Sequence, residues 1–208
     1  MGLFDMLKSK ESTESNEDRQ DSILFSTAFS SLGVDASQLV PWQARAAEID
    51  AKRLSASRGT KLLQTLWAKD HYMQNLEPQS IQELEHHVDF ATVPANRDLI
   101  RQDEYGNFMI VLLSGAVAVD RVQPWGERLR LAEIRPGEIL GEMSLLDSGM
   151  RFSACTTMGD CEIAVLTADG MDDMMTARPR LAASLIALLA RKLSLRLRVV
   201  SAHLTEKK

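Results

Sequence analysis

The sequence contains no apolar run long enough to cross a membrane. A membrane-spanning helix needs about 20 consecutive apolar residues, and no stretch of the 208 residues approaches that length. The first residues, MGLFDMLKSK, lack the apolar core and the small-residue cleavage site of a secretory signal. Met6 stands where an N-myristoylation pattern has Ser or Thr. We therefore expect a cytoplasmic protein with no transmembrane segment.

Cysteine and histidine, the common ligands of a zinc site, are scarce and poorly spaced for one. Cys155 and Cys161 lack CxxC spacing, and although the turn-like MGD between them could place them opposite each other on a hairpin, we expect buried thiols. All four histidines fall in segments with a helical pattern: His71, His86, His87 and His203. A cupin-type metalloenzyme carries its histidines on strands, and no Ser–His or Cys–His pair lies on a plausible pocket. We therefore expect no enzymatic activity, no metal and no cofactor.

The composition is that of a globular protein with one hydrophobic core. Apolar residues make up 45% of the chain and charged residues 25%, with a formal net charge of −5. The length suffices for one domain with extensions. Residues 8–22 are polar and have no apolar period, so burial cannot offset the entropy lost on ordering them. We expect residues 1–21 to form a flexible tail.

The part of the chain before Phe90 has a helical apolar pattern. Residues 22–75 have a weak helical pattern, with one segment ending at Gly33, one running through QARAAEIDAKRL after Pro41, and one ending near Asn75. A further helix, PQSIQELEHHV, is predicted with Pro78 in its first turn. We therefore expect residues 22–75 to form an N-terminal helical extension.

From Phe90 the apolar period is two, and turn signals separate several short runs. Such a density of short strands is typical of a sandwich or a closed roll. We predict a mainly β fold with flanking helices, in which residues 76–177 form an antiparallel β jelly roll.

Residues 178–208 predict one long basic helix, with Pro179 in its first turn. The helix carries two apolar stripes: Ile186, Leu189, Leu193, Leu197, Val200 and Leu204, and Leu181, Leu185, Leu188, Leu195 and Val199. Two stripes need two packing surfaces, so we expect one to meet the roll and the other a second copy of the helix in a homodimer. A wholly intramolecular groove that buries both stripes is the alternative.

Residues 178–208 have a net charge of +7, against −12 for the rest of the chain. A solvated helix face explains this charge better than a nucleic acid or membrane contact.

The stretch from Ile134 to Leu166 contains the candidate site. Pro136-Gly137 predicts a tight turn, and Gly141 allows close approach of the backbone. Glu142 supplies a hydrogen-bond acceptor, and the following MSLLDSGM predicts a short helical turn whose N–H groups can face an anion. Arg151 adds a charge-assisted clamp. Together they suit one ligand with a hydroxyl and a phosphate.

The run GEMSLLDSGMRFSA resembles the phosphate-binding cassette of the cyclic-nucleotide-binding domain of CRP–FNR regulators, kinase regulatory subunits and gated channels. The resemblance covers roughly residues 62–200. It implies that Glu142 takes the ribose 2′-hydroxyl and Arg151 the cyclic phosphate, with backbone amides and apolar residues of the roll completing the site. The expected ligand-binding residues are Gly141, Glu142, Met143, Ser144, Arg151, Phe152, Ser153 and Arg196.

Three departures from the family pattern bear on these expectations. Phe152 stands where a small Ala, Ser or Thr is usual, which removes a hydroxyl contact and places a ring beside the phosphate site. Asn96 stands where Gly is usual, and Asn tolerates the left-handed conformation. After the long helix only SAHLTEKK follows, where CRP–FNR regulators have a helix-turn-helix domain. We therefore expect no sequence-specific DNA binding.

Arg196 has two readings. The closing helix of the family often contacts the base, but an arginine that snorkels at a dimer edge is favoured here.

We expect a non-catalytic signalling domain that binds cAMP or cGMP and relays occupancy through its C-terminal helix to an unidentified protein partner. The alternative is a ligand-independent interaction scaffold with a degenerate pocket, in which Glu142 and Arg151 form an internal ion pair. A pocket filled by Phe152 would favour this alternative.

Overall fold

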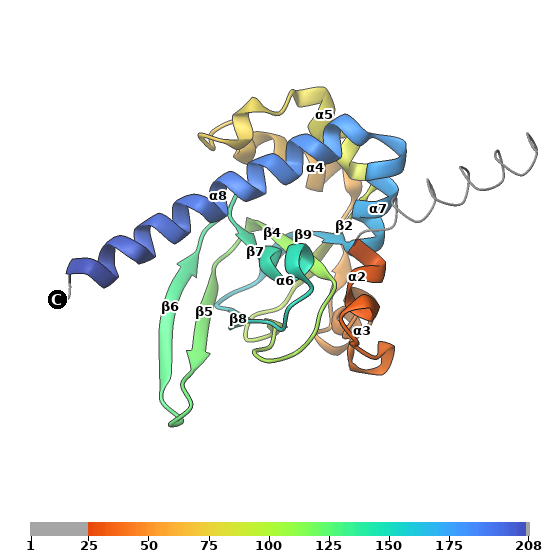
Figure 1. Cartoon of the computed structure of the whole chain (residues 1–208). Coiled ribbons are helices and arrows are strands. Elements are labelled where there is room, and N and C mark those ends of the chain that lie inside the picture. Colours follow the sequence, from red (N-terminus) through yellow and green to blue (C-terminus); the bar gives the residue numbers. More distant parts are fainter. Residues whose placement is uncertain (1–24, 207–208) are drawn as a thin grey trace, which may run out of the picture.

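A computed structural model describes residues 25–206, so the predicted tail at 1–21 lies outside the described residues (Figure 1). Its strands are β1 Lys52–Arg53, β2 Val88–Val93, β3 Asp98–Ile100, β4 Phe108–Ser114, β5 Val117–Val122, β6 Arg128–Ile134, β7 Ile139–Leu140, β8 Ala154–Thr157 and β9 Cys161–Thr167. Its helices are α2 Phe25–Ser31, η1 Ala36–Gln38, α3 Trp42–Glu48, α4 Ala56–Trp67, η2 Met73–Asn75, α5 Pro78–Glu83, η3 Leu84–His86, α6 Glu142–Asp147, α7 Ala168–Ala177 and α8 Pro179–Glu206.

The strands form two sheets, and every pairing between named strands is antiparallel. One sheet has the order β1-β2-β9-β4-β7 and the other β3-β8-β5-β6. Helix α8 crosses above this roll, and its C-terminal part extends beyond β6 (Figure 1). The predicted antiparallel β roll with N-terminal helices and a long C-terminal helix is confirmed.

Strand β4 shows how the roll is held together. Alternate residues on a strand point to opposite faces. On one face Met109, Val111 and Leu113 pack in a cluster with the helices. On the other face Phe108, Ile110 and Leu112 pack in a second cluster between the sheets. Because both faces are covered, β4 is a continuous apolar run rather than an alternating one.

The N-terminal helices are shorter than their sequence pattern predicts. The helix predicted through QARAAEIDAKRL ends at Glu48 in α3. Asp50 then adopts a positive φ of 55°, and β1 pairs with β2 through Lys52 opposite Thr92. The prediction is wrong for this end because strand pairing with a distant segment competes with the local helical preference. The helix predicted from Pro78 likewise ends at His86 in η3, where β2 takes over.

The two cysteines do not lie opposite each other. Cys155 is on β8 and Cys161 on β9, and these strands belong to different sheets, so the hairpin pairing considered from the sequence is wrong. Both are buried free thiols, as expected. Burial raises the pKa of Cys155 to about 12, which keeps this thiol protonated at neutral pH.

The fully buried apolar side chains of helix α8 lie in its first half. Leu181, Leu185 and Leu188 of one stripe and Leu189 of the other are buried. Towards the C-terminus the apolar side chains emerge: Leu195, Leu197, Val199 and Val200 are exposed. The rest of the domain therefore covers the first half of both stripes, and no described residue buries the exposed side chains in the second half. No helix among residues 25–206 combines the length and apolarity of a membrane span.

Candidate functional site

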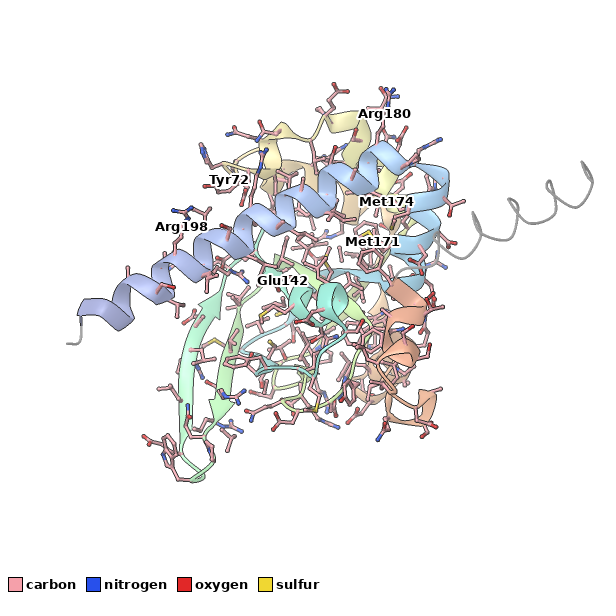
Figure 2. All side chains as sticks on the ribbon, in the orientation of Figure 1. Tyr72, Glu142, Met171, Met174, Arg180 and Arg198 are labelled. Carbon is pink, nitrogen blue, oxygen red and sulfur yellow. The ribbon has the colours of Figure 1, made fainter. Side chains whose placement is uncertain are left out.

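A cavity of about 380 Å³ lies where the β7–α6 junction, the segment around Arg151 and helix α8 meet. All eight candidate residues predicted from the sequence line it: Gly141, Glu142, Met143, Ser144, Arg151, Phe152, Ser153 and Arg196. Figure 2 shows Glu142 below α8, with Arg198 on the side of α8 that faces away from the roll. The cavity therefore brings together candidate residues up to 55 positions apart, from Gly141 to Arg196.

The apolar wall of the cavity was not named residue by residue from the sequence. It includes Ile100, Val119, Leu131, Ala132, Ile134, Leu140 and Cys155. These side chains come from strands of both sheets. The period of two indicates which strand residues share a face. It does not show which strands border the same cavity, and that depends on how the sheets stack.

Gly141 makes the junction between β7 and α6 possible. Its φ is +70°, a left-handed conformation that glycine adopts without strain. A Cβ at this position would lie 2.5 Å from Nη1 of Arg151 and 2.8 Å from Cδ1 of Ile100. The close backbone approach expected at Gly141 is confirmed, and its physical cause is the arginine side chain that passes beside it.

Arg151 is almost completely buried, with 3% of the residue exposed. Its Nη1 donates to the carbonyl oxygen of Gly141 at 2.8 Å, and its Nη2 donates to that of Phe108 at 2.6 Å. These bonds use two of the five N–H donors of the guanidinium. Burial lowers the pKa of Arg151 to about 10, so the group stays charged at neutral pH. The cavity thus has a fixed positive charge in its wall.

Glu142 does not form the internal ion pair with Arg151 that the alternative reading supposed. Its carboxylate, 7% exposed, pairs instead with Nη1 of Arg196. Nη2 of Arg196 also donates to the carbonyl oxygen of Ile139 at 3.3 Å. The expectation that Arg196 snorkels at a dimer edge stays a prediction, but within the chain its guanidinium pairs with the buried Glu142. This side chain joins α8 to the β7–α6 junction across the cavity.

Phe152 lies at the edge of the cavity and does not fill it. The residue is 54% exposed. The guanidinium of Arg121 lies 4.1 Å from its ring centroid, in the range of a cation–π contact. Arg121 also donates to the carbonyl oxygen of Phe152. A cavity remains although the bulky ring is adjacent to Arg151.

The cavity combines three kinds of surface. A buried guanidinium suits an anion, a carboxylate suits a hydroxyl group, and the apolar wall suits a flat apolar group. A ligand that offers all three at once is the best match for this arrangement.

Comparison with known proteins gives a consistent result. Residues 90–178 match the family described as "Cyclic nucleotide-binding domain". The cyclic AMP receptor protein of Thermus thermophilus is 34% identical over 100 residues, which are 48% of this chain and 46% of that protein. A CRP-like cAMP-activated global transcriptional regulator of Mycobacterium tuberculosis is 27% identical over 126 residues, 61% of this chain and 56% of that one. The chain thus spans about half the length of these curated relatives.

Solved structures show the same fold. A cyclic nucleotide-binding domain from Methylobacillus flagellatus superposes with a TM-score of 0.69 at 21% identity, covering 76% of this chain and 90% of that one. The Thermus thermophilus catabolite activator protein superposes with a TM-score of 0.54 at 28% identity, covering 65% and 63%. Residues 90–178 are thus similar in sequence to the cyclic nucleotide-binding domain family, and the solved structures share its fold.

Proposed function

We propose that this chain is a non-catalytic, cytoplasmic signalling domain that binds cAMP or cGMP in the cavity beneath α8. Residues 76–177 would form the binding roll, with 22–75 as its helical extension and 178–208 as the helix that relays occupancy to a protein partner. One observation carries the proposal. The buried guanidinium of Arg151 and the buried carboxylate of Glu142 line a single cavity, and Gly141 separates them.

In the proposed complex Arg151 binds the cyclic phosphate. Its charge and planar donor fork suit phosphate oxygens. The backbone amides of Gly141, Met143 and the residues after Arg151, Phe152 and Ser153, complete the phosphate contacts, while Ser144 lies in the first turn of α6 beside them. The apolar wall takes the base.

Glu142 binds the ribose 2′-hydroxyl in this proposal, and this connects the ligand to α8. In the structure the carboxylate accepts a hydrogen bond from Arg196 through Oε1. A ribose hydroxyl that donates to Glu142 shares or displaces that contact. Occupancy therefore changes how firmly α8 is held against the β7–α6 junction, which is the relay we propose.

Replacing Glu142 with glutamine is expected to lower the affinity for cAMP about tenfold, because a hydrogen bond to a carboxylate contributes about 1.5–3 kcal/mol. The affinity for 2′-deoxy-cAMP should change less than about twofold, since that ligand lacks the hydroxyl. Calorimetry with both ligands measures the two effects. Glu138→Gln is the matched control, because Glu138 also lines the cavity but accepts from the backbone N–H of Arg135 at 2.7 Å.

Two results would count against the proposal. Wild-type protein that gives no binding heat with cAMP or cGMP would favour the ligand-independent scaffold. An equal loss of affinity for cAMP and 2′-deoxy-cAMP in Glu142→Gln would exclude the 2′-hydroxyl contact while leaving nucleotide binding in place.

We also propose that a second copy of the chain covers the uncovered end of α8. The exposed apolar side chains there are Leu195, Leu197, Val199 and Val200, and Leu129 and Leu131 of β6 are exposed as well. These residues belong to two stripes on different faces of α8, and one of them, Leu197 with Val200, suits packing against the same stripe of a second copy about a twofold axis. The proposed assembly is therefore a homodimer built on α8.

Leu197→Lys combined with Val200→Lys is expected to convert this dimer to a monomer, because two charges would be buried in an apolar interface. Sedimentation velocity measures the change. Leu32→Lys is the control: Leu32 is 65% exposed, close to the 67% of Leu197, but follows α2, far from the C-terminal end of α8 (Figure 1). A monomeric wild-type protein would contradict the proposed dimer.

A further inference from the structure

Helix α3 lies outside the matched residues 90–178 and yet places a charged side chain in the interior. Arg45, on the last turn of α3, is 1% exposed. Its Nη1 donates to Oε2 of Glu48 at 2.7 Å, and its Nη2 donates to Oε2 of Glu104, in the segment between β3 and β4. A charge pair with one partner fully buried therefore joins α3 to that segment.

The segment around Glu104 holds Arg151 directly. The backbone N–H of Arg151 donates to the carbonyl oxygen of Glu104 at 2.8 Å, and the N–H of Asp103 donates to that of Arg151 at 2.9 Å. Gly106 lies so close to the guanidinium that a Cβ there would be 2.8 Å from Nη2. Any displacement of this segment therefore displaces Arg151, both at its backbone and at its charged end.

A second route from α3 passes through Phe108. Trp42, the first residue of α3, packs edge-on against the ring of Phe108, with centroids 5.6 Å apart. The guanidinium of Arg151 lies 4.7 Å from the centroid of the same ring, and it also donates to the backbone carbonyl of Phe108. Trp42 and Phe108 are both buried. Helix α3 thus supports the ring of Phe108, against which Arg151 packs, as well as the segment around Glu104.

Fold stability alone explains Arg45 poorly. Its Nε is buried and has no hydrogen-bond partner among the described residues. Apolar side chains of similar volume often stabilise a fold as well as a buried ion pair does. A planar guanidinium with two carboxylate partners, however, sets the position of both carboxylates. Arg45 is therefore best understood as a residue that fixes where Glu104 lies.

We propose that Arg45 and Trp42 are positioning residues for Arg151, so that the affinity for the cyclic phosphate depends on a helix outside the matched domain. The inference rests on the proposed function, since the position of Arg151 affects affinity only when Arg151 binds a phosphate. Preorganised groups bind more tightly because less ordering remains to be done on binding. Helix α3 then affects how much the phosphate contributes to the binding free energy, and it leaves the contacts of the base unchanged.

Arg45→Met removes the charge pair and keeps most of the volume. The affinity for cAMP is expected to fall about tenfold, whereas the affinity for adenosine, which has no phosphate, should stay within about twofold. Calorimetry on both ligands measures this difference. Arg97→Met is the matched control, because Arg97 also joins the N-terminal region to the roll, through Asp50 at 2.6 Å, but touches neither Arg151 nor its supports.

Glu104→Gln tests the same idea with less risk to folding, since Glu104 is 27% exposed. It also separates position from charge. Loss of a negative charge near Arg151 would by itself strengthen phosphate binding. A loosened hold on Arg151 would weaken phosphate binding, and we expect a decrease of about threefold because Arg45 then donates to a neutral amide oxygen instead of a carboxylate. An increase in affinity would overturn the proposal.

The Nε–Hε resonance of Arg151 in ¹⁵N-labelled protein gives a readout that needs no ligand. It is assigned by its disappearance in Arg151→Lys. It should shift in Arg45→Met and in Glu104→Gln and stay in place in Arg97→Met. If wild-type protein binds no nucleotide, the proposed function fails and this resonance still decides the positioning role. An unmoved resonance, or equal losses of affinity for cAMP and adenosine, would show that α3 does not position Arg151.

Discussion

Arg151→Ala is expected to lower the affinity for cAMP by about two orders of magnitude or more. Removing one partner of a buried, hydrogen-bonded charge pair typically costs about 2–5 kcal/mol of binding free energy, and in the proposed complex Arg151 is that partner for the cyclic phosphate. Its guanidinium is held in place before the ligand arrives by the carbonyl oxygens of Gly141 and Phe108. Little of its binding free energy is therefore spent on ordering the side chain.

Calorimetry with cAMP and adenosine distinguishes a lost phosphate contact from general damage to the cavity. Adenosine should bind Arg151→Ala and wild type with similar affinity. Arg151→Lys keeps a charge but loses the planar fork, so its affinity for cAMP should be intermediate. Arg58→Ala is the control, because Arg58 forms an exposed ion pair with Glu162 at 2.7 Å. An affinity of Arg151→Ala for cAMP within about threefold of wild type would remove Arg151 from the site.

Gly141→Ala should produce the largest loss of stability among the substitutions considered. Alanine at a φ of +70° costs roughly 1 kcal/mol. The added Cβ would also lie 2.5 Å from Nη1 of Arg151 and 2.8 Å from Cδ1 of Ile100, so a buried charged group or the β7–α6 backbone must move. Overpacking of this kind costs about 1–3 kcal/mol more. We expect the free energy of unfolding to fall by about 3 kcal/mol in total.

Gly126→Ala is the matched control for this effect. Gly126 has a φ of +90°, but nothing lies within 4 Å of a Cβ built there. It should therefore show only the backbone strain, with a fall in Tm of about 2–4 °C against about 6–12 °C for Gly141→Ala. Thermal unfolding followed by circular dichroism gives both values. Equal falls would mean that the contact with Arg151 contributes nothing, and that the junction accommodates a side chain.

Local signals in the sequence were sufficient for several features of the site. The positive φ at Gly137, +95°, and at Asn96, +59°, follow from preferences within a few residues. Thr167 caps α7 by accepting from the N–H of Gly170 at 3.0 Å, and threonine is a common residue at the start of a helix. The short helix after Gly141 and the start of α8 at Pro179 were likewise predicted. Each of these depends on neighbours in the chain.

Contacts between distant segments were not predictable in the same way. Arg196 was expected at a dimer edge because helical periodicity shows which side of a helix a residue occupies but not what lies beside it. The crossing of α8 over the roll places it against Glu142, 54 residues away. Cys155 and Cys161 were considered as a cross-strand pair because they flank a turn, but the chain changes sheet between them.

The amino-acid sequence by itself determined the fold class and the eight candidate residues, all of which line the cavity, but not the residues of its apolar wall. Residue type, spacing and backbone preference depend on neighbouring residues, so the sequence alone shows them. The tertiary structure decided which charges meet. Glu142 pairs with Arg196 rather than Arg151, the ring of Phe152 lies under Arg121 at the cavity edge, and Arg45 of α3 reaches Glu104. These pairings depend on how two sheets and a crossing helix stack, which no local pattern encodes.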